Sequence, residues 1–284
     1  MPQRVQSLAT PQRNFAFLEG LDADLRAALL EALRTLWTHT STALEGNTFT
    51  LGDTAFFLQE GLTIGGKSLR EHEEIYGHAK AIELVYDLVQ SPNSLNEESL
   101  FALHTLVQTQ TVTDVYTPVG AWKMEPNGTY AIGGDGKSFF LEYPAPVLVP
   151  SLMKRWTAGF AEVMATPCTR ANASQAFTAV HTSFVRIHPF ADGNGRMARL
   201  LGNMPLLASG LPPLLIAKEA RRDYIGLLGA YEQQAEPLMT ADAALLPENA
   251  ILEHFRAFCA EQWQSTWDEI DKVWAVQDKR GYQY

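Results

Sequence analysis

The sequence predicts a mainly α-helical protein that carries a single β-hairpin. Apolar residues recur at the helical period through most of the chain, as Leu21, Leu25 and Leu29 do near its start. Strand signals are concentrated in one window, residues 120–146. The chain has 284 residues, 46% of them hydrophobic, which is enough to bury one large core. We therefore expect one main helical domain with a hairpin attached to it.

The N-terminal half is expected to hold a flexible arm followed by helices. Residues 1–20 are assigned to the arm. A helix begins at Leu21 and runs towards Gly46, because glycine readily takes the conformation that ends a helix. Asn96 is a good N-cap for a later helix. The helices expected after the first one span residues 54–59, 68–89 and 96–111.

The hairpin consists of residues 129–132 and 138–143, which flank the Gly/Asp-rich turn at 133–137. A lone hairpin is marginally stable, so it must lean on the helices. Its exposed edge offers unpaired N–H and C=O groups to an extended peptide. The alternative interpretation is a purely structural hairpin that covers the core.

The C-terminal half is expected to be helical throughout. Pro189 disfavours a helical conformation at the residue before it, so the helix of residues 173–187 should end at His188. His181 on that helix is expected to be packed inside the protein. The other helices expected here span residues 147–164, 197–208, 217–234 and 248–276, the last as one helix or two.

Charge and cysteine content exclude some classes of function. The formal net charge of −10 argues against non-specific binding to nucleic acid or to an anionic membrane. Cys168 and Cys259 are far apart and lack metal-ligand spacing, which is typical of free thiols in a reducing compartment. No apolar run is long enough to span a membrane. We expect a cytoplasmic protein, and the sequence leaves a secreted-effector route open.

Residues 188–199, which read HPFADGNGRMAR, combine the residue types of a phosphate-binding site. Gly193 and Gly195 flank Asn194, and glycines let successive N–H groups turn inwards as an anion nest. A helix that opens at such a turn adds free N–H donors and the positive end of its dipole. Arg196 and Arg199 are three residues apart, so both can flank the turn and fork onto phosphate oxygens.

Two further residues of this stretch suggest chemistry. Asp192 is a hard oxygen ligand, suited to a Mg²⁺ ion that bridges phosphates. His188 can accept a proton from an attacking hydroxyl. Phe190, between them, is best interpreted as a core anchor. The alternative is an ordinary turn with solvated arginines, which the agreement of nine specified positions disfavours.

This stretch resembles the signature of the Fic (Fido) family of AMP-transferases, H-P-F-x-[D/E]-G-N-G-R-x-x-R, at every specified position. The similarity extends more loosely over about residues 40–240. Such proteins typically move AMP from ATP to a Ser, Thr or Tyr hydroxyl of a target protein and release pyrophosphate. The resemblance implies a Fic-type helical bundle with a hairpin flap over residues 21–284, with a C-terminal helical extension.

The resemblance also implies roles for individual residues. His188 would be the base and Asp192 the Mg²⁺ ligand. The flap near Tyr130–Gly133 would align the target by strand pairing. The residues implied to bind the nucleotide are Gly193, Asn194, Gly195, Arg196, Arg199, Tyr224, Ile132 and Gly133.

A second motif, Ser41-x-x-x-Glu45-Gly46, resembles the family's inhibitory sequence [S/T]-x-x-x-E-[G/N]. In such members the motif lies on a helix beside the ATP site, and its glutamate pairs with the second arginine, here Arg199. The resemblance implies a weakly active resting protein in which Glu45 keeps ATP from binding productively. We expect Glu45→Gly to activate it.

The sequence departs from the family pattern in two places. Trp122-Lys123 stands where many relatives have an aromatic–Arg pair, which implies a weaker flap contact. Tyr231-Glu232-Gln233 stands where relatives often have an asparagine near the adenine, which leaves the choice of nucleotide open. The alternatives to AMP transfer are transfer from another nucleotide, removal of AMP from a target, and a permanently closed regulatory binding protein. The target protein and any homo-oligomer are not identifiable from the sequence.

Overall fold

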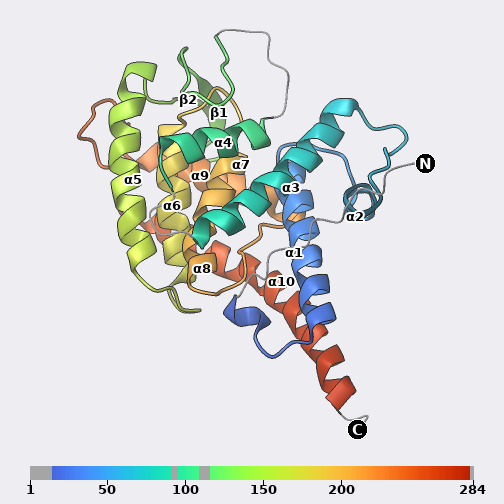
Figure 1. The fold of residues 1–284 in the computed structure, drawn as a ribbon. Coiled ribbons are helices and arrows are strands. Elements are labelled where there is room, and N and C mark those ends of the chain that lie inside the picture. Colours follow the sequence, from blue (N-terminus) through green and yellow to red (C-terminus); the bar gives the residue numbers. More distant parts are fainter. Residues whose placement is uncertain (1–14, 91–94, 109–115, 282–284) are drawn as a thin grey trace.

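The structure, a computed structural model, describes residues 15–90, 95–108 and 116–281. In these ranges it is a bundle of α-helices with one two-stranded antiparallel sheet (Figure 1). The mainly α class with one hairpin is therefore confirmed for the described part of the chain. In chain order the elements are η1 (Ala16–Leu18), α1 (Ala23–Leu44), α2 (Leu51–Glu60), α3 (Leu69–Val89), α4 (Glu97–Val107), β1 (Gly128–Ile132), β2 (Ser138–Glu142), η2 (Pro146–Leu148), α5 (Val149–Ala165), α6 (Ala173–Ile187), α7 (Asn194–Gly202), α8 (Met204–Ala208), η3 (Lys218–Ala220), α9 (Arg221–Gln234) and α10 (Ala250–Gly281).

The segment before α1 is packed, which corrects the flexible arm expected for residues 1–20. Phe15, Phe17 and Leu18 are buried in the main core, and the Phe17 N–H donates to the Gly210 carbonyl at 3.2 Å. Removing three large apolar side chains from water stabilises this packing by several kcal/mol, at roughly 1.5–3 kcal/mol each. Residues 1–14 of the expected arm lie outside the described residues.

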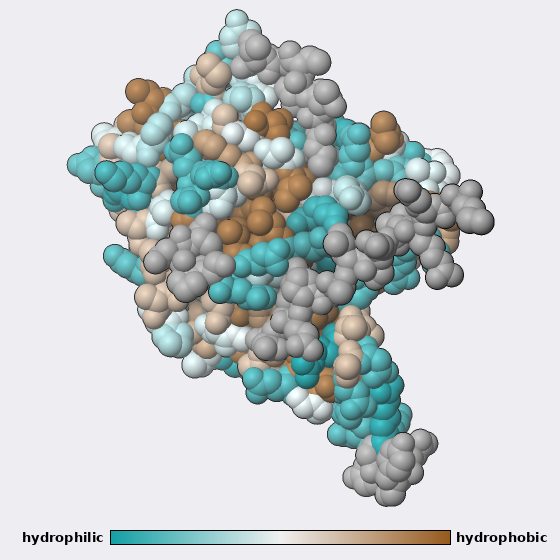
Figure 2. Space-filling model, in the orientation of Figure 1, coloured by the Kyte–Doolittle hydropathy of each residue, from teal (hydrophilic) through white to brown (hydrophobic). Residues whose placement is uncertain are grey.

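The first and last long helices, α1 and α10, lie side by side (Figure 1). At their outer end Arg280 pairs with Asp22 and Asp24 at 3.0 and 2.7 Å. These ion pairs are exposed, so they contribute little stability. Figure 2 shows hydrophilic residues along this projecting end, whereas hydrophobic residues gather in the middle of the same face. The other end of α1 reaches α7, and this contact brings Glu45 to the motif.

The motif is carried by two consecutive central helices, α6 and α7. The bounds of α6 are those that the sequence predicts. The next helix was expected over residues 197–208, but α7 begins at Asn194 because Gly193, with φ +77°, supplies its left-handed N-cap. The segment also divides into α7 and α8 near Asn203. Pro205 has no N–H to continue the α7 hydrogen-bond ladder, which explains the break.

Other helix bounds differ slightly from those expected. Helix α4 ends at Val107, because Gln108 has left the helical conformation; residues 109–111 of the expected helix lie outside the described residues. The expected helix at 217–234 starts with a 3₁₀ turn before α9. The C-terminal segment forms one continuous helix, α10, which settles the choice between one helix and two.

The hairpin rests on α9, as its marginal stability requires. Strands β1 and β2 pair with Tyr130 opposite Phe140, and both aromatic side chains are exposed. A Cβ at Gly229 of α9 would lie 2.5 Å from the Ile132 carbonyl oxygen, so glycine permits this close approach. The turn is also held, because the Gly134 N–H donates to Gln233 Oε1 at 2.9 Å.

The described residues also bear on the two cysteines and on membrane-spanning helices. Cys168 and Cys259 are buried free thiols, which confirms that they form no disulfide. Among the helices that the structure describes, none has both the length and the apolarity to cross a membrane.

Candidate functional site

His188 lies where α6 gives way to the motif loop. Its N–H donates to the Phe184 carbonyl at 3.0 Å, and its backbone is left-handed with φ 49°. Such a conformation costs a non-glycine residue about 1–3 kcal/mol, which the surrounding packing must offset. Pro189 disfavours the right-handed helical alternative. The chain therefore leaves α6 abruptly and turns towards α7.

The imidazole of His188 has a defined orientation. Its ring stacks on Tyr143, with centroids 3.6 Å apart and planes 8° apart. Nδ1 lies 3.2 Å from the Val185 carbonyl oxygen, so Nδ1 donates and Nε2 keeps its lone pair. Burial, followed by the charge of Lys123, lowers the pKa of His188 to about 3. The ring is therefore neutral at physiological pH and can accept a proton.

The loop after His188 is clamped from inside. Asn194 Oδ1 accepts from the Phe190 N–H at 3.0 Å, and Asn194 Nδ2 donates to the Phe190 carbonyl at 2.9 Å. The Phe190 ring is fully buried and stacks on His104, with centroids 3.8 Å apart. The prediction that Phe190 anchors the loop in the core is confirmed.

The base of the flap holds the same loop from outside. The Lys123 N–H donates to the Pro189 carbonyl at 2.8 Å, and Lys123 Nζ donates to Asn127 Oδ1 at 2.6 Å. Asn127 Nδ2 in turn donates to the Phe190 carbonyl at 3.1 Å. Burial lowers the pKa of Lys123 to about 8. Lys123 thus links the segment before the hairpin to the loop that carries His188.

His104 of α4 is a residue that sequence reasoning missed. Its Nδ1 accepts from the Gly120 N–H at 2.9 Å, so Nε2 must carry the proton that it donates to the Asp192 carbonyl at 3.0 Å. Burial lowers its pKa to about 4. A neutral His104 therefore ties α4, the segment before the flap and the motif loop together.

The glycine turn opens α7 as the sequence predicts. The first N–H groups of a helix have no acceptor within it, so Asn194 and Gly195 present backbone donors, whereas the Gly193 N–H already donates to Asp192 Oδ1. A Cβ at Gly195 would lie 2.5 Å from Glu45 Oε1. The Glu45 carboxylate therefore rests directly on this turn, where an anion is favoured.

Asp192 and Arg196 lie on the α4 side of the turn. Asp192 is largely exposed, and its two carboxylate oxygens accept from the Gly193 N–H at 2.7 Å and from Gln108 Nε2 at 3.3 Å. Arg196 is buried and donates to the Val107 carbonyl and to Gln108 Oε1, both at 2.9 Å. Arg196 thus holds the end of α4 and shares no hydrogen-bond partner with Arg199.

Arg199 bonds to residues at the end of α1 instead. Its Nη2 donates to Glu45 Oε1 at 2.7 Å and to the Ser41 carbonyl at 2.9 Å. Its Nε donates to Ser41 Oγ at 3.0 Å. The contact that the resemblance implied between Glu45 and Arg199 is present. Arg199 is 4% exposed at its side chain and Glu45 43%, so solvent can reach the carboxylate but hardly the guanidinium.

The remaining expected nucleotide residues lie close to α9. Ile132 ends β1, and Gly133 follows it. A Cβ at Gly133 would lie 2.4 Å from the Gln233 side chain of α9, so glycine permits this close approach. Tyr224 is 2% exposed, so it is not a surface side chain. Its hydroxyl lies 2.8 Å from His181 Nε2 and 3.4 Å from Arg199 Nη1, behind the arginine.

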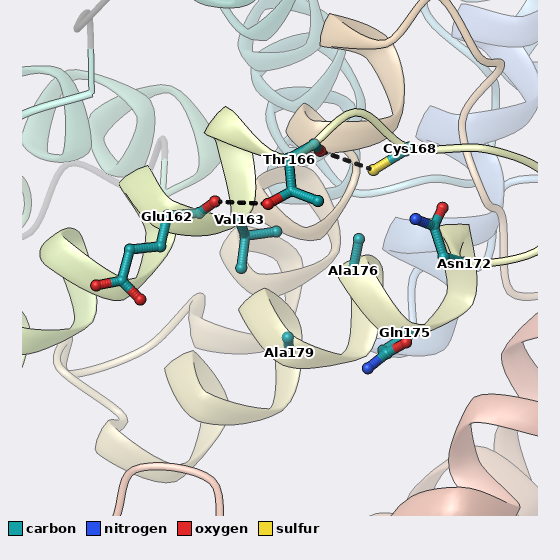
Figure 3. A pocket seen from close by; sticks show the side chains of 8 residues that line it. All are labelled: Glu162, Val163, Thr166, Cys168, Asn172, Gln175, Ala176 and Ala179. Atoms are coloured by element: carbon teal, nitrogen blue, oxygen red, sulfur yellow. Dashed lines mark hydrogen bonds between the residues drawn. The ribbon is translucent and has the colours of Figure 1, made fainter.

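Grooves border some of these elements. One, of about 450 Å³, runs between β2 and the end of α9 and shares Tyr143 with His188. Another, of about 300 Å³, lies between α5 and α6 (Figure 3). Its lining includes aliphatic and amide groups, Glu162, Thr166 and Cys168, whose Sγ is 4.0 Å from the Thr166 carbonyl. This second groove borders the first half of α6, so it does not belong to the site around His188.

Asp192 is the exposed carboxylate on the α4 side of the turn. Within the described ranges, no three His, Cys, Asp or Glu side chains are grouped as a protein-only metal site requires. Mg²⁺ is commonly held by one or two carboxylates together with substrate phosphates and water. Asp192, exposed beside the free N–H groups of α7, fits that mode of binding.

A helical bundle that presents a neutral histidine beside a glycine-opened helix defines an anion-binding site with a built-in base. The Fic/DOC family model matches residues 94–206, which include this site. The chain is also 31% identical over 195 residues to the protein adenylyltransferase fic-1 of Caenorhabditis briggsae, covering 68% of this chain and 36% of that protein. It is 29% identical over 226 residues to the protein adenylyltransferase Fic of Drosophila yakuba, covering 80% and 42%.

Solved structures show a similar fold. A Fic-domain signalling protein from Bacteroides thetaiotaomicron superposes with a TM-score of 0.75 at 27% identity, covering 91% of this chain and 93% of the other. A fragment of Fic-1 from C. elegans gives a TM-score of 0.67 at 23% identity, covering 93% and 69%. The chain therefore carries a Fic/DOC domain on a Fic-type fold. It spans less than half the length of the curated relatives named above.

Proposed function

We propose that this protein is a protein adenylyltransferase, which moves AMP from ATP to a Ser, Thr or Tyr hydroxyl of a target protein. The observation that carries the proposal is the neutral His188, with Nε2 free, on the loop that leads into the N-terminus of α7. The adenylyltransferase names of the relatives support the same reaction.

His188 acts as the general base in this proposal. Its Nε2 takes the proton of the target hydroxyl, and the hydroxyl oxygen attacks the α-phosphorus of ATP. A new P–O bond forms while the bond between the α-phosphorus and the bridging oxygen breaks, and pyrophosphate leaves. The stacked Tyr143 and the Val185 carbonyl keep the ring in place for this transfer.

The turn and its flanking residues hold the phosphates. Gly193, Asn194 and Gly195 form the turn that cradles the phosphates, with backbone N–H donors from Asn194 and Gly195, while Arg199 takes the triphosphate end. Arg196 adds positive charge from the α4 side, where it also keeps the turn in place. Asp192 would hold Mg²⁺, which when bound offsets the negative charge of the phosphates.

The hairpin is proposed as the flap that presents the target. In the described chain the sheet has two strands, so an extended target segment can add to a free strand edge near Tyr130–Gly133. Ile132 and Gly133 then lie between the target and the nucleotide. Support comes from the link of Lys123 and Asn127 between the flap base and the His188 loop, which couples the two in position.

Glu45 is proposed as an autoinhibitory group. Its carboxylate occupies the mouth of the glycine turn and one N–H donor of Arg199, both of which the phosphates need. Ser41, from the same helix, takes two more bonds of this arginine. The resting protein is thus closed to productive ATP binding, and movement or loss of Glu45 opens it.

We also propose that residues 21–284 form one Fic domain, with a core at about 40–240 and α10 as its C-terminal extension. Burial of α10 residues such as Phe255 and Trp263 against the core supports a single unit. The two buried free thiols are consistent with a cytoplasmic location.

The test is incubation of the wild-type, Glu45→Gly and Glu45→Gly/His188→Ala proteins with α-labelled ATP, GTP, CTP and UTP. We expect Glu45→Gly to label itself or a lysate protein from ATP and the double variant to lose this label. Labelling that survives removal of His188 would refute the mechanism. Preference for another nucleotide would refute adenylylation while leaving the site in place.

A further inference from the structure

The guanidinium of Arg199 is held on two sides by different parts of the fold. Three of its hydrogen bonds go to α1, to Ser41 Oγ, to the Ser41 carbonyl and to Glu45 Oε1. A fourth goes to the hydroxyl of Tyr224, on α9. If Glu45 is displaced, Arg199 loses that one contact, while its bonds to Ser41 and Tyr224 remain.

The bond to Tyr224 continues to a second buried residue. Arginine can only donate, so the Tyr224 oxygen accepts from Arg199 Nη1. The Tyr224 proton is then directed to His181 Nε2, 2.8 Å away, which must be unprotonated to accept it. His181 and Tyr224 are 0% and 2% exposed, and both pack against Phe255. The series of hydrogen bonds therefore runs in one donor-to-acceptor direction, from Arg199 through Tyr224 to His181, and its last two members are tightly packed.

We propose that Tyr224 and His181 are positioning residues that hold the Arg199 guanidinium in one place for two competing anions, the Glu45 carboxylate and the nucleotide triphosphate. This inference rests on the proposed function. Tyr224 acts through Arg199 rather than by touching the nucleotide, since its hydroxyl is engaged and its ring is buried.

A count of donors explains why a fixed guanidinium is useful. Arginine has five N–H donors, and four are used here, one of them by Glu45. Departure of Glu45 leaves one free N–H on each terminal nitrogen. That is a two-pronged donor suited to a phosphate. Tyr224 keeps these two N–H groups directed towards the glycine turn. One anion can therefore replace the other while the arginine side chain keeps its conformation.

The first experiment measures nucleotide binding by calorimetry in the Glu45→Gly background, with ATP and with AMP as probes. Tyr224→Phe is expected to weaken ATP binding about tenfold, the cost of one hydrogen bond to a charged group, and to leave AMP binding unchanged. The matched control is Tyr231→Phe, which removes another buried tyrosine hydroxyl of α9, bonded to the Pro247 carbonyl at 2.9 Å. The control should change neither affinity.

Conservative variants of the second residue extend this test. His181→Leu removes the acceptor behind Tyr224 and should give the same selective loss of ATP affinity, while His181→Gln, which keeps an acceptor, should restore most of it. These variants also decide the matter if Tyr224→Phe does not fold. Unchanged ATP affinity in Tyr224→Phe or in His181→Leu, or an equal loss for ATP and AMP, would overturn the proposal.

A second experiment tests the resting state without nucleotide. The unfolding equilibria of the wild type, Tyr224→Phe, Glu45→Gln and the double variant form a thermodynamic cycle. Coupling between Tyr224 and Glu45 through Arg199 predicts at least about a threefold departure from additivity in the unfolding constant. Additive effects would overturn the inference. If Glu45→Gly binds no nucleotide, the proposed function fails, and this cycle still decides the role of Tyr224.

Discussion

Replacement of Glu45 by glycine tests how strongly the resting site is closed. In the wild type, the carboxylate lies on the glycine turn and pairs with Arg199 at 2.7 Å. Glycine removes the carboxylate, but Arg199 keeps its bonds to Ser41 and Tyr224. The binding site for the triphosphate is therefore opened without loss of the arginine that should bind it.

The size of the effect follows from the strength of that ion pair. A hydrogen bond to a charged group contributes about 1.5–3 kcal/mol. The Glu45 side chain is 43% exposed, so solvent screening favours the lower end of that range. About 1.5 kcal/mol corresponds to a site that is open roughly one-tenth of the time, and apparent affinity scales with that fraction. Glu45→Gly should therefore lower the dissociation constant of ATP about tenfold.

Calorimetric titration of ATP into the two proteins measures this change directly. Glu45→Gln keeps the size of the side chain and loses its charge, so its affinity should lie between those of the wild type and Glu45→Gly. The control is Glu31→Gly, which removes a glutamate of α1 that pairs with Arg34 at 2.8 Å, away from α7. If Glu45→Gly stays within about a factor of two of the wild type, or if Glu31→Gly binds equally tightly, Glu45 does not control access.

Three further variants or conditions test other parts of the site. Phe190→Ala should lower the free energy of unfolding by about 3–5 kcal/mol in denaturant titration, because it empties a fully buried position; a loss below about 1 kcal/mol would contradict the anchor role. Gly195→Ala places a methyl group 2.5 Å from Glu45 Oε1 and so should displace that carboxylate. Because the methyl group also blocks the glycine turn, the variant should not transfer label from α-labelled ATP to protein; such transfer would contradict the role of this turn in phosphate binding. The pKa values of buried His104 and His181 are lowered to about 4 and 3 from 6.5, so the folded state takes up fewer protons than the unfolded state. Stability should therefore fall as pH drops below about 6.5, by roughly 1.4 kcal/mol per pH unit for each histidine, and a flat pH profile of unfolding would contradict their burial as neutral rings.

Local signals made much of the fold predictable. The periodic apolar face and Pro189 predicted the bounds of α6, and the Gly/Asp turn predicted the hairpin. The contact between Glu45 and Arg199 was anticipated through a family resemblance, since 154 residues separate the partners and no periodic pattern links them. Phe15, Phe17 and Leu18 could have been recognised as core residues, because three large apolar side chains in a short stretch do not suit a flexible arm.

The support around the motif could not be predicted in the same way. His104 reaches the Asp192 carbonyl across 88 residues, and Asn127 reaches the Phe190 carbonyl across 63. A polar side chain on a helix or loop carries no sign of its partner, because that partner is set by how α4 and the flap base pack on α7. The different partners of Arg196 and Arg199 have the same origin, since packing brings the Val107 carbonyl at the end of α4 to Arg196.

The fate of each phosphate of ATP tests the central claim most directly. Glu45→Gly protein is incubated with ATP labelled either at the α-phosphate or at the γ-phosphate, and both the protein and the released products are analysed. AMP transfer predicts that the α label becomes bound to protein and the γ label leaves as pyrophosphate, in equal amounts. A γ label on protein, or release of free phosphate without protein labelling, would contradict AMP transfer at this site.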